Sequence, residues 1–79
     1  MNIDLYDLIL CLTYQHDSAL CIKVAHLLGY DEQELGFTLS YYSPKIPVDT
    51  QIQDVIDHIG NDEVKRVLTS SFHLHTKDK

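Results

Sequence analysis

Apolar residues recur three and four positions apart along almost the whole chain, and only short polar breaks separate one run from the next. A helical turn takes about 3.6 residues, so this spacing places the apolar side chains on one face of each helix. The pattern predicts an all-α fold, a compact bundle of about five short helices. Expected helices cover residues 3–14, 18–28, 50–59 and 62–72, and a further one begins after Asp31.

Capping residues stand at several of the expected helix ends. Asp17 and Asp31 each precede a helix, where a short acidic side chain accepts hydrogen bonds from free backbone amides. Glu34 follows Asp31 by three residues, which is the arrangement of a capping box. Gly29 follows the second helix, where glycine enters the left-handed conformation without steric cost.

The segment after Asp31 allows two structures. Leu35 and Leu39 continue the helical pattern. Residues 36–43, however, combine a glycine with aromatic residues that favour extended structure, so this segment is either helix or a short strand. We expect Phe37 to enter the core and at least one of the adjacent Tyr41 and Tyr42 to face outward.

The segment 43–47 contains two prolines and predicts a connecting loop, because proline removes an amide donor and disfavours helix in the residue before it. The next helix is expected to begin at Asp49 or Thr50 and to end at a glycine. Asn61 is placed to cap the last helix. The tail, residues 73–79, is expected to fray.

The chain has 79 residues, which predicts a single helical domain over residues 1–79. A domain this short buries little surface by itself, so a partner subunit would add useful stability. Tyr6, Leu10 and Tyr14 make the second face of the first helix apolar, so this helix is either central to the bundle or packed against a second chain. We predict a homodimer that uses these three residues.

Twelve acidic residues against six basic ones give a net charge of −6. This charge repels phosphate backbones and anionic membrane surfaces. No apolar run approaches the roughly 20 residues needed to span a bilayer, and the acidic start of the chain is unlike an export signal. We therefore predict a cytoplasmic protein that contacts neither nucleic acid nor membrane directly.

Cys11 and Cys21 lie inside apolar helical patterns, which predicts buried free thiols, with a disulfide or a metal role as the alternative. Together with His16 and His26 they form a series in steps of five residues. Each such step turns a helical side chain by about 140°, so the four cannot converge on one metal ion. We predict no metal and no cofactor.

A general base can be proposed at His58, which stands near Asp54 and Asp57. These three residues lie on the polar face of their helix, where a solvated charged surface is the expected state. The chain also contains no glycine-rich phosphate loop. We predict that the protein is not an enzyme and has no small-molecule substrate.

The segment from Val24 to Leu35 has the spacing of a helix-turn-helix, with an alanine, a glycine four residues later and a leucine six residues beyond that. It resembles part of an AraC-type DNA-binding helix pair, and the resemblance implies a small DNA-binding transcriptional regulator. The second helix of this pair opens with Asp31, Glu32 and Glu34 and lacks the lysine or arginine that contacts phosphates and guanines. A helix-turn-helix-like pair without DNA contact is therefore the preferred interpretation.

The segment Tyr41-Tyr42-Ser43-Pro44 is similar to the paired tyrosines near a proline in the bacteriocin immunity proteins, which are acidic inhibitors of nucleases. This resemblance implies a protein that inhibits by binding. Tyrosines are effective interface anchors because they combine a large contact area with a polar tip. We predict that Tyr41 and Tyr42 hold a partner protein that Asp31, Glu32 and Glu34 attract by their charge.

These features predict a non-enzymatic acidic regulator that binds a basic or DNA-binding partner protein and inhibits or sequesters it. Phage antirepressors and small inhibitors share this size and charge, which is an inference from protein class. The alternative is the small helix-turn-helix regulator that binds DNA itself.

Overall fold

Short polar caps set the ends of the first two helices. α1 (Leu5–His16) begins after Asp4, whose carboxylate accepts a hydrogen bond of 2.8 Å from the amide of Tyr6. α2 (Ser18–Leu28) follows after the single residue Asp17, which caps it through the amide of Ala19. The computed structural model describes residues 3–46 and 51–72. The predicted cap at Asp17 is confirmed.

The turn into α3 (Glu32–Tyr42) combines a left-handed glycine with a capping box. Gly29 has φ 88° and ends α2. Asp31 accepts a hydrogen bond of 2.8 Å from the amide of Glu34, whose side chain in turn accepts one of 3.1 Å from the amide of Asp31. Both predicted motifs are confirmed, and the segment after Gly36 is helix, not strand, because this strong cap starts a helix that packs on α1.

The second half of the chain contains a short 3-10 turn, η1 (Ser43–Lys45), and two helices, α4 (Ile52–His58) and α5 (Asp62–Phe72). Asn61 caps α5 by accepting a hydrogen bond of 3.1 Å from the amide of Val64, as predicted. The expected start of α4 at residue 49 or 50 and the expected frayed tail, residues 73–79, lie outside the described residues.

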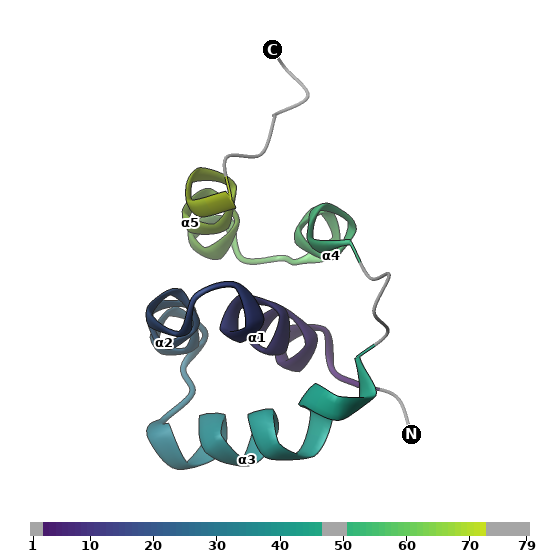
Figure 1. Cartoon of the computed structure of the whole chain (residues 1–79). Coiled ribbons are helices and arrows are strands. Elements are labelled where there is room, and N and C mark those ends of the chain that lie inside the picture. Colours follow the sequence, from purple (N-terminus) through teal and green to yellow (C-terminus); the bar gives the residue numbers. More distant parts are fainter. Residues whose placement is uncertain (1–2, 47–50, 73–79) are drawn as a thin grey trace.

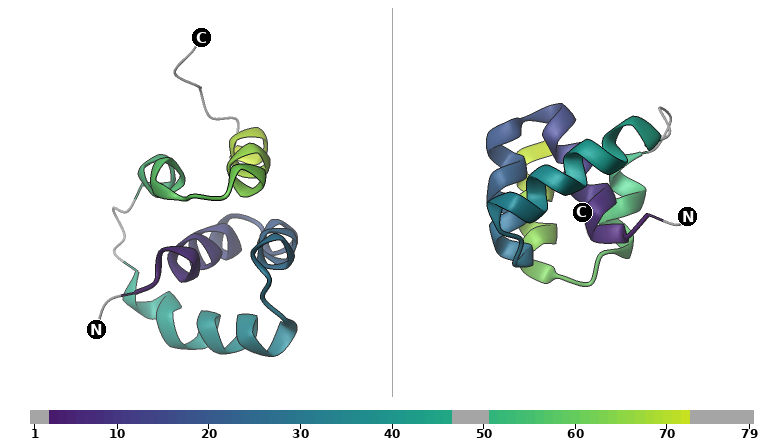
Figure 2. Two further views of the ribbon diagram at one scale, coloured as in Figure 1. Left: turned by 180° about the vertical axis from the view of Figure 1, so that it is seen from behind. Right: turned by 90° about the horizontal axis from the view of Figure 1, so that it is seen from below.

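The helices stack in three layers (Figure 1). α1 and α2 lie side by side in the middle layer, α4 and α5 cover one side of it, and α3 crosses the other side (Figure 2). This arrangement confirms the predicted all-α bundle of five helices, and the described residues contain no strand. Within residues 3–46 and 51–72, no helix has the length and apolar character to cross a membrane.

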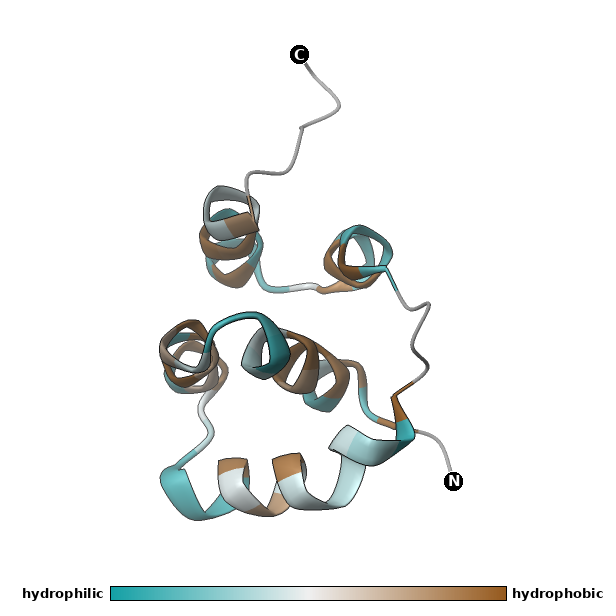
Figure 3. Cartoon of the chain, viewed as in Figure 1, coloured by the Kyte–Doolittle hydropathy of each residue, from teal (hydrophilic) through white to brown (hydrophobic). Residues whose placement is uncertain are grey.

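The core lies between the middle layer and the layer formed by α4 and α5, where the apolar sides of these four helices face one another (Figure 3). α1 is central, because α2, α3 and α4 all pack against it. The helical spacing of the second helix predicts a buried stripe of Leu20, Val24, Leu27 and Leu28, and this prediction is partly wrong. Leu20 and Val24 are buried with Cys21 and Ala25, whereas Leu27 is 36% exposed, because the buried face of α2 is rotated towards α1.

Candidate protein-binding groove

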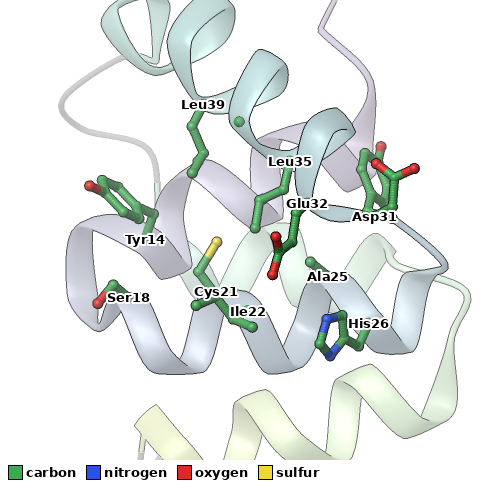
Figure 4. A pocket seen from close by; sticks show the side chains of 12 residues that line it. Tyr14, Ser18, Cys21, Ile22, Ala25, His26, Asp31, Glu32, Leu35 and Leu39 are labelled. Carbon is green, nitrogen blue, oxygen red and sulfur yellow. The ribbon is translucent and has the colours of Figure 1, made fainter.

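A groove of about 240 Å³ lies between α2 and α3 (Figure 4). It exists because α3 packs mainly against α1, which leaves space between α3 and α2. Its apolar walls come from Ile22 and Ala25 of α2 and from Leu35 and Leu39 of α3. These residues define what is called below the α2–α3 groove.

The walls follow from helical spacing on both sides of the α2–α3 groove. Leu35 and Leu39 are one turn apart, and Figure 4 shows their side chains pointing from α3 towards α2. Ile22 is 50% exposed, and Tyr14, which closes one end, is 49% exposed. The groove therefore presents apolar surface that the described residues do not cover.

Acidic side chains lie at the other end of the α2–α3 groove, near His26. The carboxylate of Asp31 and that of Glu34 are engaged in the capping box. Glu32 is exposed, and its carboxylate points towards α2 over the groove (Figure 4). Within residues 3–46 and 51–72, Glu32 forms no hydrogen bond or ion pair, so its negative charge is available to a ligand.

A hydrogen bond from Tyr30 to Asp7 sets the position of α3 relative to α1. The phenol of Tyr30, which lines the groove, donates to the buried carboxylate of Asp7 in the first turn of α1. Burial and this carboxylate raise the pKa of Tyr30 above its ordinary value. The phenol thus stays protonated and remains a donor at neutral pH, which holds the turn between α2 and α3 in place.

Two buried thiols lie in or beside the groove. Cys21 lines it, and its Sγ donates to the carbonyl oxygen of Leu10 at 3.2 Å. Burial raises the pKa of Cys21, and burial together with the charge of Asp7 raises the pKa of Cys11 to about 11. Because the thiolate is the reactive form, neither cysteine is a nucleophile at neutral pH. Both are free and buried, as predicted.

An aromatic cluster, formed by Phe37, Tyr41 and Tyr42, lies along α3 outside the lining of the groove. The rings of Phe37 and Tyr41 stack with centroids 5.7 Å apart, and those of Tyr41 and Tyr42 meet edge to face at 4.8 Å. Lys45 places its Nζ 3.9 Å from the centroid of the Tyr41 ring. The predicted core position of Phe37 is wrong, since this side chain is 67% exposed.

The five predicted partner-binding residues lie on one helix and its cap but do not form one surface. Asp31 and Glu32 line the α2–α3 groove, whereas Glu34 does not. Tyr41 and Tyr42 are half-buried at the opposite end of α3, about 15 Å away along the helix axis. With Ile3 and Lys45 they line a second cavity, of about 360 Å³.

The three predicted dimerisation residues lie in different environments. Tyr6 is half-buried against the core, and Tyr14 is exposed at the end of the groove. Leu10 is 0% exposed and belongs to the core, so it is unavailable to a second chain while the fold is intact. The second face of α1 is apolar because this helix is central, which was the other interpretation of its pattern.

The evenly spaced cysteines and histidines do not converge. Cys11 and Cys21 are buried, whereas His16 and His26 are exposed, and the ring of His16 packs on Phe72 with centroids 4.2 Å apart. In the part of the chain that the structure describes, no three His, Cys, Asp or Glu residues come together in a group that could hold a metal ion. The sequence also contains His73 and His75, which could supply two weak ligands to a divalent ion, and both lie outside the described residues.

Sequence reasoning missed the apolar walls of the groove. Ile22 stands outside the expected stripe of α2, and an isoleucine at such a position was the one local signal of an uncovered surface. Leu35 and Leu39 were expected to face the core, and they do contact it while also lining the groove. Their second role depends on the space between α2 and α3.

Comparison with protein-family models, with curated proteins and with solved structures finds no match to this chain. The function is therefore argued from the shape, the apolar walls and the charge of the α2–α3 groove.

Proposed function

We propose that this chain is a non-catalytic regulator that binds a basic partner protein and inhibits or sequesters it, with the α2–α3 groove as the binding site. The observation that carries the proposal is an apolar groove overhung by the carboxylate of Glu32, which has no partner within residues 3–46 and 51–72. A cytoplasmic location is part of the same proposal.

The size of the groove favours side chains of a protein over a small molecule. Its volume of about 240 Å³ falls below the roughly 300–1,000 Å³ typical of small-molecule sites. Its walls are apolar, and the thiol of Cys21, which lines it, is buried and has a raised pKa. These features support recognition of an apolar segment and give no support to catalysis.

The length of the groove suits a helical segment. Its lining extends from Ser18 to His26 on α2 and from Glu32 to Leu39 on α3, which corresponds to about 12 Å along α2 and about 10 Å along α3. Two turns of an amphipathic helix would present apolar side chains at positions i, i+3 and i+4, as in other helix-in-groove complexes.

The charge of the chain supports a basic partner. Glu32 has no partner among the described residues, and the chain as a whole carries a net charge of −6. A lysine or arginine flanking the apolar side chains of the segment would meet the Glu32 carboxylate at the end of the groove. Such complementarity mainly increases the association rate and excludes acidic competitors.

Affinity capture with matched variants tests the site. Ile22→Asp places a charge in the groove wall, whereas Leu27→Asp places one on an exposed part of α2 outside the groove. From a lysate of the organism that encodes the chain, we expect a basic protein to be retained by the wild type and by Leu27→Asp and lost by Ile22→Asp. Equal retention by both variants would show that the groove is not the site.

Charge reversal tests whether the carboxylate of Glu32 attracts the partner protein. Glu32→Lys and Asp62→Lys each replace the first residue of a helix, so both carry a similar unfavourable interaction with the helix dipole. We expect only Glu32→Lys to slow association with the captured partner and to weaken its salt dependence. Identical rates for the two variants would contradict a role for Glu32.

A DNA-binding regulator remains the second candidate because two features of the AraC-like segment are present. Ala25 is 1% exposed and Gly29 has a left-handed backbone, as the helix-turn-helix spacing requires. A gel-shift experiment on defined duplexes decides between the candidates. Retardation that weakens in Gln33→Ala, an exposed position of α3, would favour DNA binding.

A further inference from the structure

One face of α3 lines the α2–α3 groove, and a side chain is missing from the middle of this face. Its positions follow helical spacing at i, i+3, i+4 and i+7, which are Glu32, Leu35, Gly36 and Leu39. A Cβ built at Gly36 would meet no atom of the described chain within 4 Å. The groove therefore contains an open space one helical turn from Glu32, which is called below the Gly36 gap.

Nothing in the described chain requires a glycine at this position. The φ of Gly36 is not positive, since Gly29 is the glycine with a left-handed backbone among the described residues. Glycine in the interior of a helix is less stable than alanine, so α3 loses stability at Gly36. The same glycine lets a ligand pack directly against the helix backbone, because it has no Cβ.

The groove around the Gly36 gap is acidic, and its lining within residues 3–46 and 51–72 contains no lysine or arginine. The carboxylate of Glu32 has no hydrogen bond or ion pair in this part of the chain, and Asp31 adds a second carboxylate beside it. His26 lies at the same end of the groove on the opposite wall (Figure 4). A cationic group on an apolar stem matches this end of the groove in both charge and polarity.

A guanidinium group suits these surroundings better than an ammonium group. It is planar, and its fork of donors matches both oxygens of a carboxylate such as that of Glu32. It also stacks on ring faces, such as that of His26, and is more weakly hydrated than an ammonium group. The methylenes of an arginine side chain would then lie over Gly36, where no Cβ obstructs them.

We propose that the Gly36 gap is a subsite for an arginine of the bound segment, with the methylenes against the backbone of α3 and the guanidinium on the carboxylate of Glu32. This inference rests on the proposed function, because the partner protein supplies the arginine. It also gives the groove a specificity. The walls at Leu35 and Leu39 take apolar side chains, and the subsite selects arginine over lysine.

Titration of the isotope-labelled full chain with n-hexylguanidinium chloride tests the subsite without the partner protein. n-Hexylammonium chloride, at the same concentration and a low, constant ionic strength, is the comparison. We expect the guanidinium to shift the amide signals of Glu32, Leu35 and Gly36 until they saturate, and to bind about threefold or more tightly than the ammonium. Equal binding of the two cations would overturn the proposal, as would a guanidinium that leaves these three signals unmoved.

Filling the Gly36 gap tests its part in binding. Gly36→Leu places a side chain in the gap, whereas Ser40→Leu adds the same side chain at an exposed position one turn along α3, outside the groove lining. Both variants should fold, because leucine is a better helix former than glycine or serine. We expect Gly36→Leu to abolish the saturable shifts and Ser40→Leu to keep them. Equal binding by the two folded variants would overturn the proposal.

Removing single charges tests the carboxylate. Glu32→Gln should raise the dissociation constant of hexylguanidinium about fivefold, the upper range for one exposed ion pair. Glu34→Gln is the matched control, because Glu34 lies outside the groove lining and glutamine also serves in a capping box. Equal dissociation constants for the two variants would contradict a guanidinium seated on Glu32.

The partner from the capture experiment separates this inference from the proposed function. Loss of the partner by Ile22→Asp, with full retention by Gly36→Leu, would keep the groove as the binding site and overturn the arginine subsite. Retention of the partner by Ile22→Asp, with hexylguanidinium still bound beside Gly36 and Glu32, would overturn the proposed function and leave the guanidinium site in place.

Discussion

The phenol of Tyr30 donates a hydrogen bond to the buried carboxylate of Asp7, which joins the turn between α2 and α3 to the first turn of α1. The two residues are 23 positions apart in the sequence. Because Tyr30 also lines the α2–α3 groove, this one bond connects the stability of the fold to the width of the groove.

Replacing Tyr30 with phenylalanine keeps the ring and removes the donor. We expect Tyr30→Phe to lower the free energy of unfolding by about 1–3 kcal/mol, because the carboxylate of Asp7 is then buried without this donor. Urea denaturation followed by circular dichroism measures the change. Replacing the half-exposed Tyr14 with phenylalanine is the matched control and should have little effect. Equal stability of the two variants would show that the Tyr30–Asp7 bond contributes nothing.

The raised pKa values of Tyr30 and Cys11 predict a loss of stability at alkaline pH. In both cases the folded state favours the neutral form, so the stabilisation is complete below the ordinary pKa values of 9.0 for cysteine and 10.0 for tyrosine. It is lost as the pH rises through the folded-state pKa, which is about 11 for Cys11. The free energy of unfolding, measured between pH 7 and pH 11, should therefore decrease above about pH 9. In the Tyr30→Phe variant, the free energy of unfolding should decrease less steeply above about pH 10.

The burial of both thiols predicts slow chemical modification. Cys11 and Cys21 are each 0% exposed, and their raised pKa values leave little thiolate at neutral pH. We expect alkylation of the native chain by iodoacetamide at pH 7.5 to be slow and to become rapid and complete in denaturant, as mass spectrometry can follow. Fast labelling of either cysteine without denaturant would contradict its position in the structure.

The capping box at the start of α3 contributes measurably to the free energy of unfolding. Asp31→Ala removes the acceptor for the amide of Glu34 and should cost about 1 kcal/mol of unfolding free energy. Glu32→Ala changes the adjacent acidic residue, which has no role in the cap, and should alter stability by less than about 0.5 kcal/mol. Thermal and urea unfolding of the two variants measures the difference. Equal stability of Asp31→Ala and Glu32→Ala would contradict a stabilising role for the capping box.

The helices and their caps could be predicted from the sequence because their signals are local. Asp17, Gly29, Asp31 and Asn61 act within three or four residues of themselves, so the backbone positions they specify follow from the order of residues alone. The choice between helix and strand after Gly36 was less secure, because the propensities of its glycine and aromatic residues conflict with the capping box.

Burial was harder to predict because it depends on which helices become neighbours. Leu10 and Phe37 are both apolar residues in amphipathic patterns, yet one is 0% and the other 67% exposed. α1 has helices on several sides, whereas α3 lies at the edge of the bundle. The α2–α3 groove escaped prediction for the same reason, since its walls come from two helices whose separation is set by contacts with α1.

The position of the partner on the surface tests the central claim most directly. The measurement is a titration of the isotope-labelled chain with the partner retained in the capture experiment, followed by amide chemical shifts. We expect the largest shifts at Ile22, Ala25, Leu35 and Leu39, the walls of the α2–α3 groove. Shifts that spare these residues and gather on α4 and α5 would show that the groove is not where the protein binds its partner.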